Sequence, residues 1–79
     1  MENFGKRLRT IREKRGFSQL QLAKMIAKIG VVQGYKVDTV GKYERGACLP
    51  GCYKLHDICV ALNVSADYLL GLSDKEDLK

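Results

Sequence analysis

Three cysteines and one histidine in the second half of the chain are residue types that could bind a metal. Cys52, His56 and Cys59 follow helical spacing, so a helix would place them on one face, and Cys48 could fold back toward them. Three thiols and an imidazole form a valid set of zinc ligands. However, this spacing is not that of a known zinc module, and free cysteine often packs as a small buried hydrophobe. We therefore expect Cys52 and Cys59 to pack in the protein, with no metal and no other cofactor.

The sequence offers no support for catalysis. It contains one histidine, no serine-histidine-acid set that we can place, no phosphate-binding glycine loop and no paired carboxylates in a plausible pocket. An odd number of thiols also argues against a structural disulfide in a cytosolic protein. We expect a protein that is not an enzyme.

The length and the charge of the chain limit which classes of protein it can belong to. A chain of 79 residues forms one domain and leaves no room for a deep substrate pocket beside its core. Because no apolar run approaches the ~18 residues of a membrane span and no apolar signal region is present, we expect a cytoplasmic protein without a membrane partner. The net charge of +5 divides into +7 for residues 1–46 and −2 for residues 47–79. The basic half either attracts a polyanion or is only a solvated surface.

Local signals predict two helices in the first third of the chain. The first helix spans roughly residues 3–15, with Asn3 as its N-cap and basic residues on the faces away from its apolar stripe. The second helix spans residues 19–28 and begins with a capping box between Ser18 and Gln21. A loop is predicted after it, because glycine and β-branched residues interrupt the helical pattern.

Start and stop signals predict three further helices, so the fold is expected to be all-α. These signals are Asp38 and Gly46 for a helix over about 38–45, Pro50 and Asn63 for the fourth helix, and Ser65 and Gly71 for the fifth. The helices form a domain of residues 1–72, and residues 73–79 are expected to be a frayed, charged tail. The predicted core consists of Phe4, Leu8, Ile11, Leu22, Ala23, Ile26, Val40, Tyr43, Leu55, Ile58, Cys59, Leu62, Val64, Leu69 and Leu70.

Three ordered stretches carry a family resemblance. Residues 5–23, residues 39–46 together with Pro50, and residues 62–71 resemble the Cro/C1-type (XRE-family) helix-turn-helix DNA-binding domains of phages and bacteria. The resemblance covers residues 3–72 and implies a five-helix lambda-repressor-like fold. One departure is the connection between the second and third helices, which is longer here than is usual in the family.

The resemblance implies that the third helix reads base edges in the DNA major groove. Its base-reading positions correspond here to Val37, Asp38, Gly41 and Lys42. Lys42 can donate to guanine, Val37 can touch a thymine methyl, and Asp38 can either accept from cytosine or cap the helix. Gly41 has no side chain but would let the backbone come close to the duplex. So few base-reading groups suggest modest sequence discrimination, with DNA shape contributing the rest.

Other positions are expected to bind the phosphate backbone. The resemblance places Gln19 at a phosphate-contacting position, where the N-terminus of the second helix already favours an anion. Thr39 and Arg45 are further candidates, as are parts of the first helix. The lengthened connection could reach the backbone with Lys36, or it could only cover the surface.

Two pairings within or between chains are also expected. Glu44 is expected to pair with a basic residue such as Arg12 and so to brace the fold.

Proteins of this family bind as dimers to two half-sites about one helical turn apart. Tyr68, Leu69 and Leu72 are candidates for the surface of self-association, unless they belong to the core.

The function that follows is a sequence-specific, double-stranded DNA-binding transcriptional regulator of the repressor type, acting as a homodimer. The alternative is a protein-interaction module on the same fold, of the antitoxin or anti-repressor type. The weak set of base readers and the acidic second half keep this alternative open.

Overall fold

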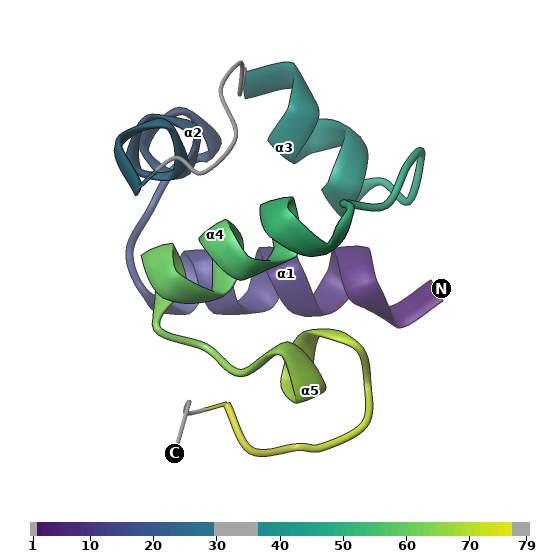
Figure 1. Cartoon of the computed structure of the whole chain (residues 1–79). Coiled ribbons are helices and arrows are strands. Elements are labelled where there is room, and N and C mark those ends of the chain that lie inside the picture. Colours follow the sequence, from purple (N-terminus) through teal and green to yellow (C-terminus); the bar gives the residue numbers. More distant parts are fainter. Residues whose placement is uncertain (1, 30–36, 77–79) are drawn as a thin grey trace.

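The computed structural model describes residues 2–29 and 37–76 (Figure 1). Over these residues the chain forms helices and no strands, which confirms the predicted all-α class. Each of these helices is too short or too polar to cross a bilayer. The helices are α1 (Glu2–Lys14), α2 (Gln19–Ile29), α3 (Val37–Glu44), α4 (Cys52–Leu62) and α5 (Ala66–Leu69). The lengthened connection, Gly30–Lys36, lies outside the described residues.

The helices pack around one another so that α3 is held from two sides. α3 packs against both α1 and α2, α2 also packs against α4, and α5 packs against α1 and α4. Figure 1 shows α2 and α3 at one end of the molecule and α5 at the other, with α1 and α4 between them. The exposed side of α3 is therefore a face of the molecule that α5 and the C-terminal segment do not cover.

The core consists largely of the predicted side chains. Leu55 and Leu70 differ from the prediction, because they are only partly buried and pack at the edge of the core. Ala61 and Tyr68 are buried although they were not predicted to be. The other buried apolar residues are Phe4, Leu8, Ile11, Leu22, Ala23, Ile26, Val40, Tyr43, Ile58, Cys59, Leu62, Val64 and Leu69.

Burial also corrects the expected surface of self-association. Tyr68 is 8% exposed and Leu69 is fully buried, so both belong to the core. Only Leu72, at 76% exposed, presents an apolar side chain to solvent from that set. The predicted surface of Tyr68, Leu69 and Leu72 is therefore wrong for two of its three members.

Most helix ends follow the local signals. The capping box is confirmed, since the backbone N–H of Gln21 donates to Ser18 Oγ at 3.0 Å and the backbone N–H of Ser18 donates to Gln21 Oε1 at 2.8 Å. Ser65 caps α5 in the predicted way, accepting from the Tyr68 N–H at 3.0 Å. The predicted left-handed stops are also present, at Gly16, Gly46, Asn63 and Gly71.

Three helix starts differ from the prediction. α1 begins at Glu2, one residue before the expected cap, and α3 begins at Val37, so Asp38 lies inside its first turn and is not the N-cap. α4 begins at Cys52, after the extended N-cap residue Gly51. Pro50 therefore precedes the cap, where its fixed φ favours the extended chain that leads into the helix.

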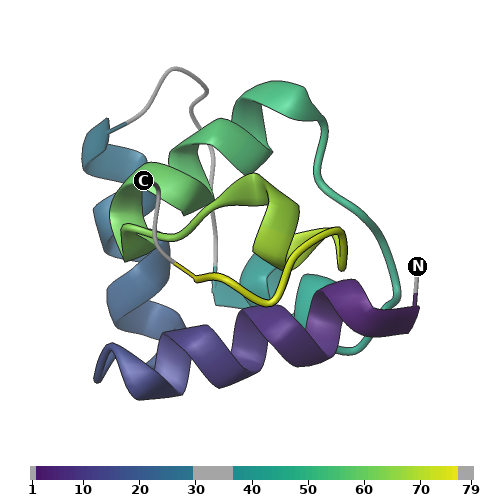
Figure 2. The ribbon, with the colours of Figure 1, turned by 90° about the horizontal axis from the view of Figure 1, so that it is seen from below.

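The segment after α5 is fastened to the domain. The Ser65 N–H donates to the carbonyl of Glu76 at 2.8 Å, and Lys14 Nζ lies 2.7 Å from Glu76 Oε1. Arg7 donates to the Ser73 carbonyl at 3.0 Å and binds the Asp74 carboxylate at 3.3 Å. Figure 2 shows this segment lying alongside α1. The expectation of a frayed tail is wrong for residues 73–76, while residues 77–79 lie outside the described residues.

A glycine lets α1 approach the end of α3. Gly5 is buried, and a Cβ built there would lie 2.5 Å from the carbonyl oxygen of Glu44 and 2.6 Å from that of Tyr43. Both contacts are to backbone atoms, which cannot rotate away as a side chain can. The missing Cβ thus sets the distance between α1 and the last turn of α3.

We expect Gly5→Ala to destabilise the protein by about 1–3 kcal/mol, because the added methyl group would force the two helices apart. Alanine would stabilise an exposed helix position by ~1 kcal/mol over glycine, so the sign of the change separates packing from helix propensity. The free energy of unfolding from urea titration measures it. Thr10→Ala, at an exposed site on the same helix, is the matched control and should be neutral or slightly stabilising.

Candidate nucleic-acid interface

α3 presents a polar face to solvent because its apolar residues point inward. Val40 and Tyr43 are 1% and 2% exposed and contribute to the core. Asp38 and Lys42 are exposed and Thr39 is partly exposed, so these predicted site residues share the accessible side of the helix. The side chain of Val37 lies outside the described residues, as does Lys36. Their predicted roles stay predictions.

Gln19, Gly41 and Arg45 meet where α2 abuts α3. Gln19 is the first residue of α2, and its Nε2 donates to Glu44 Oε1 at 3.1 Å. A Cβ at Gly41 would lie 3.1 Å from Arg45 Nη1 and 3.6 Å from Gln19 Oε1. Gly41 is accordingly buried beneath these two side chains, so its backbone is not open to a duplex in this conformation. The side chains of Gln19 and Arg45, which cover Gly41, present polar groups at this position instead of the Gly41 backbone.

A buried ion pair fixes this arrangement. Arg12 is 8% exposed, and its Nε lies 2.5 Å from Glu44 Oε2 while its Nη2 lies 3.1 Å from Glu44 Oε1. Arg12 Nη1 also donates to the carbonyl of Phe17 at 2.7 Å, in the turn before α2. The hydrogen bond to Glu44 raises the pKa of Arg12, against the opposing effect of burial. The expected pairing of Glu44 with Arg12 is confirmed, and it joins α1, the following turn and α3.

Two other basic residues, Arg7 on α1 and Arg15 just after it, point into the protein. Lys6 and Arg9 stay exposed on α1, so the expectation that parts of this helix hold phosphate stays a prediction for them. Arg7 donates to the carbonyl of Tyr68 at 3.0 Å and stacks over the Tyr68 ring. Arg15 donates to the carbonyls of Leu62 and Asn63 at 2.9 and 3.2 Å. The last carbonyls of a helix lack partners within it, and these arginines supply them.

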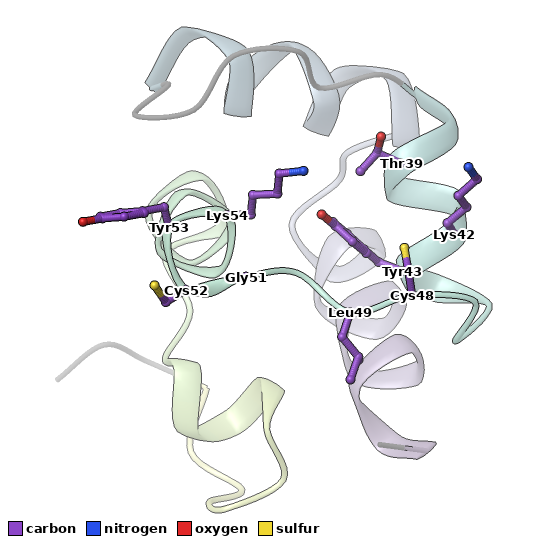
Figure 3. Close-up of a pocket in the computed structure, with 9 residues that line it drawn as sticks. All are labelled: Thr39, Lys42, Tyr43, Cys48, Leu49, Gly51, Cys52, Tyr53 and Lys54. Carbon is purple, nitrogen blue, oxygen red and sulfur yellow. The ribbon is translucent and has the colours of Figure 1, made fainter.

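A groove separates the exposed face of α3 from the start of α4 (Figure 3). Its volume is about 560 Å³, and Thr39 and Lys42 line one side of it. Tyr53 and Lys54 line the other side, and neither was predicted as a site residue. Lys54 belongs to the half of the sequence whose net charge is −2, so the charge of that half gives no sign of a cation that the fold brings to the groove beside α3.

The cysteines and the histidine do not gather around a common point. Cys59 is 6% exposed and packs as predicted, whereas Cys52 is exposed, which corrects the expectation that it packs in the protein. His56 Nδ1 lies 3.1 Å from an oxygen of the fully buried Asp57. Within residues 2–29 and 37–76, no three His, Cys, Asp or Glu side chains are grouped as metal ligands would be.

Comparison with known proteins agrees with this geometry. A family profile described as a helix-turn-helix domain matches residues 3–70 of the chain. The chain belongs to the helix-turn-helix family. Among relatives of this helix-turn-helix domain is the uncharacterized HTH-type transcriptional regulator YazB of Bacillus subtilis (strain 168). It is 35% identical over 68 residues, which cover 86% of this chain and 88% of the relative. The resemblance drawn from the sequence is thereby confirmed.

We expect Glu44→Ala to destabilise this helix-turn-helix domain by about 3–5 kcal/mol, because it leaves the Arg12 charge buried without its carboxylate. Glu13→Ala is the matched control, since Glu13 forms an exposed pair with Arg9 on α1 and should cost less than about 0.5 kcal/mol. Urea titration of both variants at neutral pH measures the difference. Equal losses in the two variants would contradict a bracing role for the Arg12–Glu44 pair.

Proposed function

We propose that this helix-turn-helix domain is a sequence-specific, double-stranded DNA-binding transcriptional regulator of the repressor type, acting in the cytoplasm as a homodimer. The observation that carries the proposal is the fixed presentation of α3. Its inward side chains are buried, its end is clamped by the Arg12–Glu44 pair, and its outward side carries Lys42 beside a groove. A helix held in this way can enter a major groove without rearrangement of the domain.

Base reading is assigned to the exposed residues of α3. Lys42 is exposed on the groove side and can donate to guanine O6 or N7. Asp38 is exposed in the first turn and, since it is not the helix cap, is available to accept from cytosine N4. Two such groups give limited direct discrimination, which favours a contribution from DNA shape.

Phosphate binding is assigned to polar groups that surround α3. Gln19 stands at the N-terminus of α2, Arg45 follows the last residue of α3, and Thr39 and Lys54 face each other across the groove. These groups come from three helices, so they can follow a DNA backbone on both sides of the groove that α3 enters. The arginines of α1 that bind carbonyls are excluded from this set.

Binding-site selection from a random duplex library, at near-physiological salt, tests the proposal. We expect a two-fold symmetric motif with half-sites about one helical turn, roughly 34 Å, apart, because two copies of α3 must reach successive major grooves. No enrichment by protein shown to be folded would contradict DNA binding. That result would favour the interaction-module alternative, for which exposed apolar residues such as Tyr53 and Val60 on α4 offer a surface.

Two substitutions separate base reading from phosphate binding. Lys42→Ala should lower discrimination among single-base variants of the selected site by about 1–3 kcal/mol, because it removes a base-edge donor. Arg45→Ala should weaken binding to all sites alike and reduce the slope of log K against log salt by about 1. Fluorescence anisotropy titrations at several salt concentrations give both quantities. Lys75→Ala, at an exposed site in the segment along α1, is the control and should change neither. The opposite pattern would mean that the roles of Lys42 and Arg45 are exchanged.

A further inference from the structure

α3 contains a glycine that its backbone conformation does not require. Gly41 lies in the interior of this eight-residue helix, where glycine is among the least favourable residues. The described glycines with a positive φ are Gly16, Gly46 and Gly71, and Gly41 is not among them. Because a short helix has little stability of its own, a glycine at this position needs a reason other than backbone conformation.

The space beside Gly41 differs from the space beside Gly5. A Cβ at Gly5 would meet backbone carbonyls, whereas the nearest atom to a Cβ at Gly41 is Nη1 of Arg45, at 3.1 Å. The next atoms are Oε1 and Nε2 of Gln19 at 3.6 and 3.9 Å, which are ordinary van der Waals distances. The packing of the helices therefore does not exclude a side chain at Gly41. An added methyl group would instead displace the end of the Arg45 side chain.

The last turn of α3 directs Arg45 toward Gly41. The backbone N–H of Arg45 donates to the carbonyl of Gly41 at 3.0 Å, so the two residues are one helical turn apart. Long side chains on a helix point back over the preceding turn. The Arg45 side chain follows this direction, and its guanidinium lies over the glycine. The missing Cβ is what leaves room for it there.

Arg45 also differs from the other arginines in its partners. In the part of the chain that the structure describes, its guanidinium has no hydrogen-bond acceptor and no carboxylate beside it. A guanidinium carries five N–H donors, and a phosphate can accept two of them at once. Arg45 is exposed, so an anion can reach these donors. The four arginines that instead bind carbonyls or carboxylates of the protein are Arg7, Arg9, Arg12 and Arg15.

Gln19 places a second donor next to Arg45. Its Nε2 donates one N–H to Glu44 Oε1 at 3.1 Å, which fixes the side chain and leaves the second N–H of the amide for a ligand. Gln19 is also the first residue of α2, where the backbone N–H groups favour an anion. Donors from the start of α2 and from the residue after α3 therefore meet above Gly41.

We propose that Gly41 is a positioning residue, whose missing Cβ lets Arg45 fold back along α3 so that Arg45 and Gln19 bind the same DNA phosphate. The inference rests on the proposed function and deepens it, because that function assigns both residues to phosphate without saying what aligns them. Gly41 itself contacts neither base nor phosphate. This role differs from the base-reading role that the family resemblance implies for Gly41.

The first experiment examines the free protein without DNA. In NMR spectra of the folded wild type, we expect NOEs between the Hα protons of Gly41 and the side-chain protons of Arg45. Gly41→Ala should raise the urea midpoint of unfolding, because alanine favours the helix and only a flexible side chain must move. Gly5→Ala is the matched control and should lower the midpoint, because backbone atoms block its methyl group. Missing NOEs, or a lowered midpoint for Gly41→Ala, would overturn the inference whether or not the protein binds DNA.

The second experiment is a double-mutant cycle on DNA affinity, measured by fluorescence anisotropy with the selected duplex. Gly41→Ala should weaken binding about threefold or more, to the selected site and to its single-base variants alike, because it displaces a phosphate donor. In the Arg45→Ala background it should change affinity by less than about twofold, because that donor is already absent. In the Lys75→Ala background, which removes an exposed charge elsewhere, the full loss should persist.

The cycle separates an effect through Arg45 from a direct effect of the methyl group. An equal loss in the Arg45→Ala background would mean that the methyl group itself meets the duplex, and it would overturn the inference. Unchanged affinity of Gly41→Ala alone would overturn it as well. Absence of DNA binding by the folded wild type would instead contradict the proposed function, and the NOEs and urea midpoints would still decide where Arg45 lies.

Discussion

The buried contact between the Arg12 guanidinium and the Glu44 carboxylate is the interaction on which the arrangement of this domain depends. Arg12 is only 8% exposed, so the N–H donors of its guanidinium need acceptors inside the protein. These acceptors come from α3 and from the turn before α2. The same carboxylate accepts from Gln19 on α2. Three helices are thus fixed to one another through a single pair of charges, because neither charge can be left buried alone without a large cost.

The Arg12–Glu44 ion pair fixes the position of α3 together with a second contact, the close approach of the α3 backbone to Gly5. The ion pair holds the end of α3 through a side chain, whereas Gly5 admits the carbonyls of the same helix turn against α1. One contact is directional and the other is steric, so together they limit both rotation and separation of α3. An eight-residue helix has little helical stability of its own, and its geometry must come from such tertiary contacts.

What could be predicted from the sequence was mainly what depends on neighbouring residues. The capping box at Ser18 and the left-handed stop at Gly46 are local, so their residue types sufficed. The family resemblance supplied the pairing of Glu44. The partners of Arg7 and Arg15 are carbonyls about 50 to 60 residues away, and a carbonyl has no residue type to recognise. Lys54 was missed for a related reason, since its place in the groove depends on how α4 packs and not on its neighbours in the chain.

The path of the chain along α1 places the two ends of the described structure apart. The start of α1 lies against the end of α3 through Gly5, while Glu76 is bound to Lys14 at the opposite end of α1. An α-helix rises about 1.5 Å per residue, so Gly5 and Lys14 lie roughly 14 Å apart along α1. A fluorophore or affinity tag joined near residue 76 would stand clear of the exposed side of α3, whereas one joined before Glu2 would lie nearer the last turn of that helix. The carboxyl end is therefore the attachment point that this fold favours for immobilisation or for fusion to a reporter.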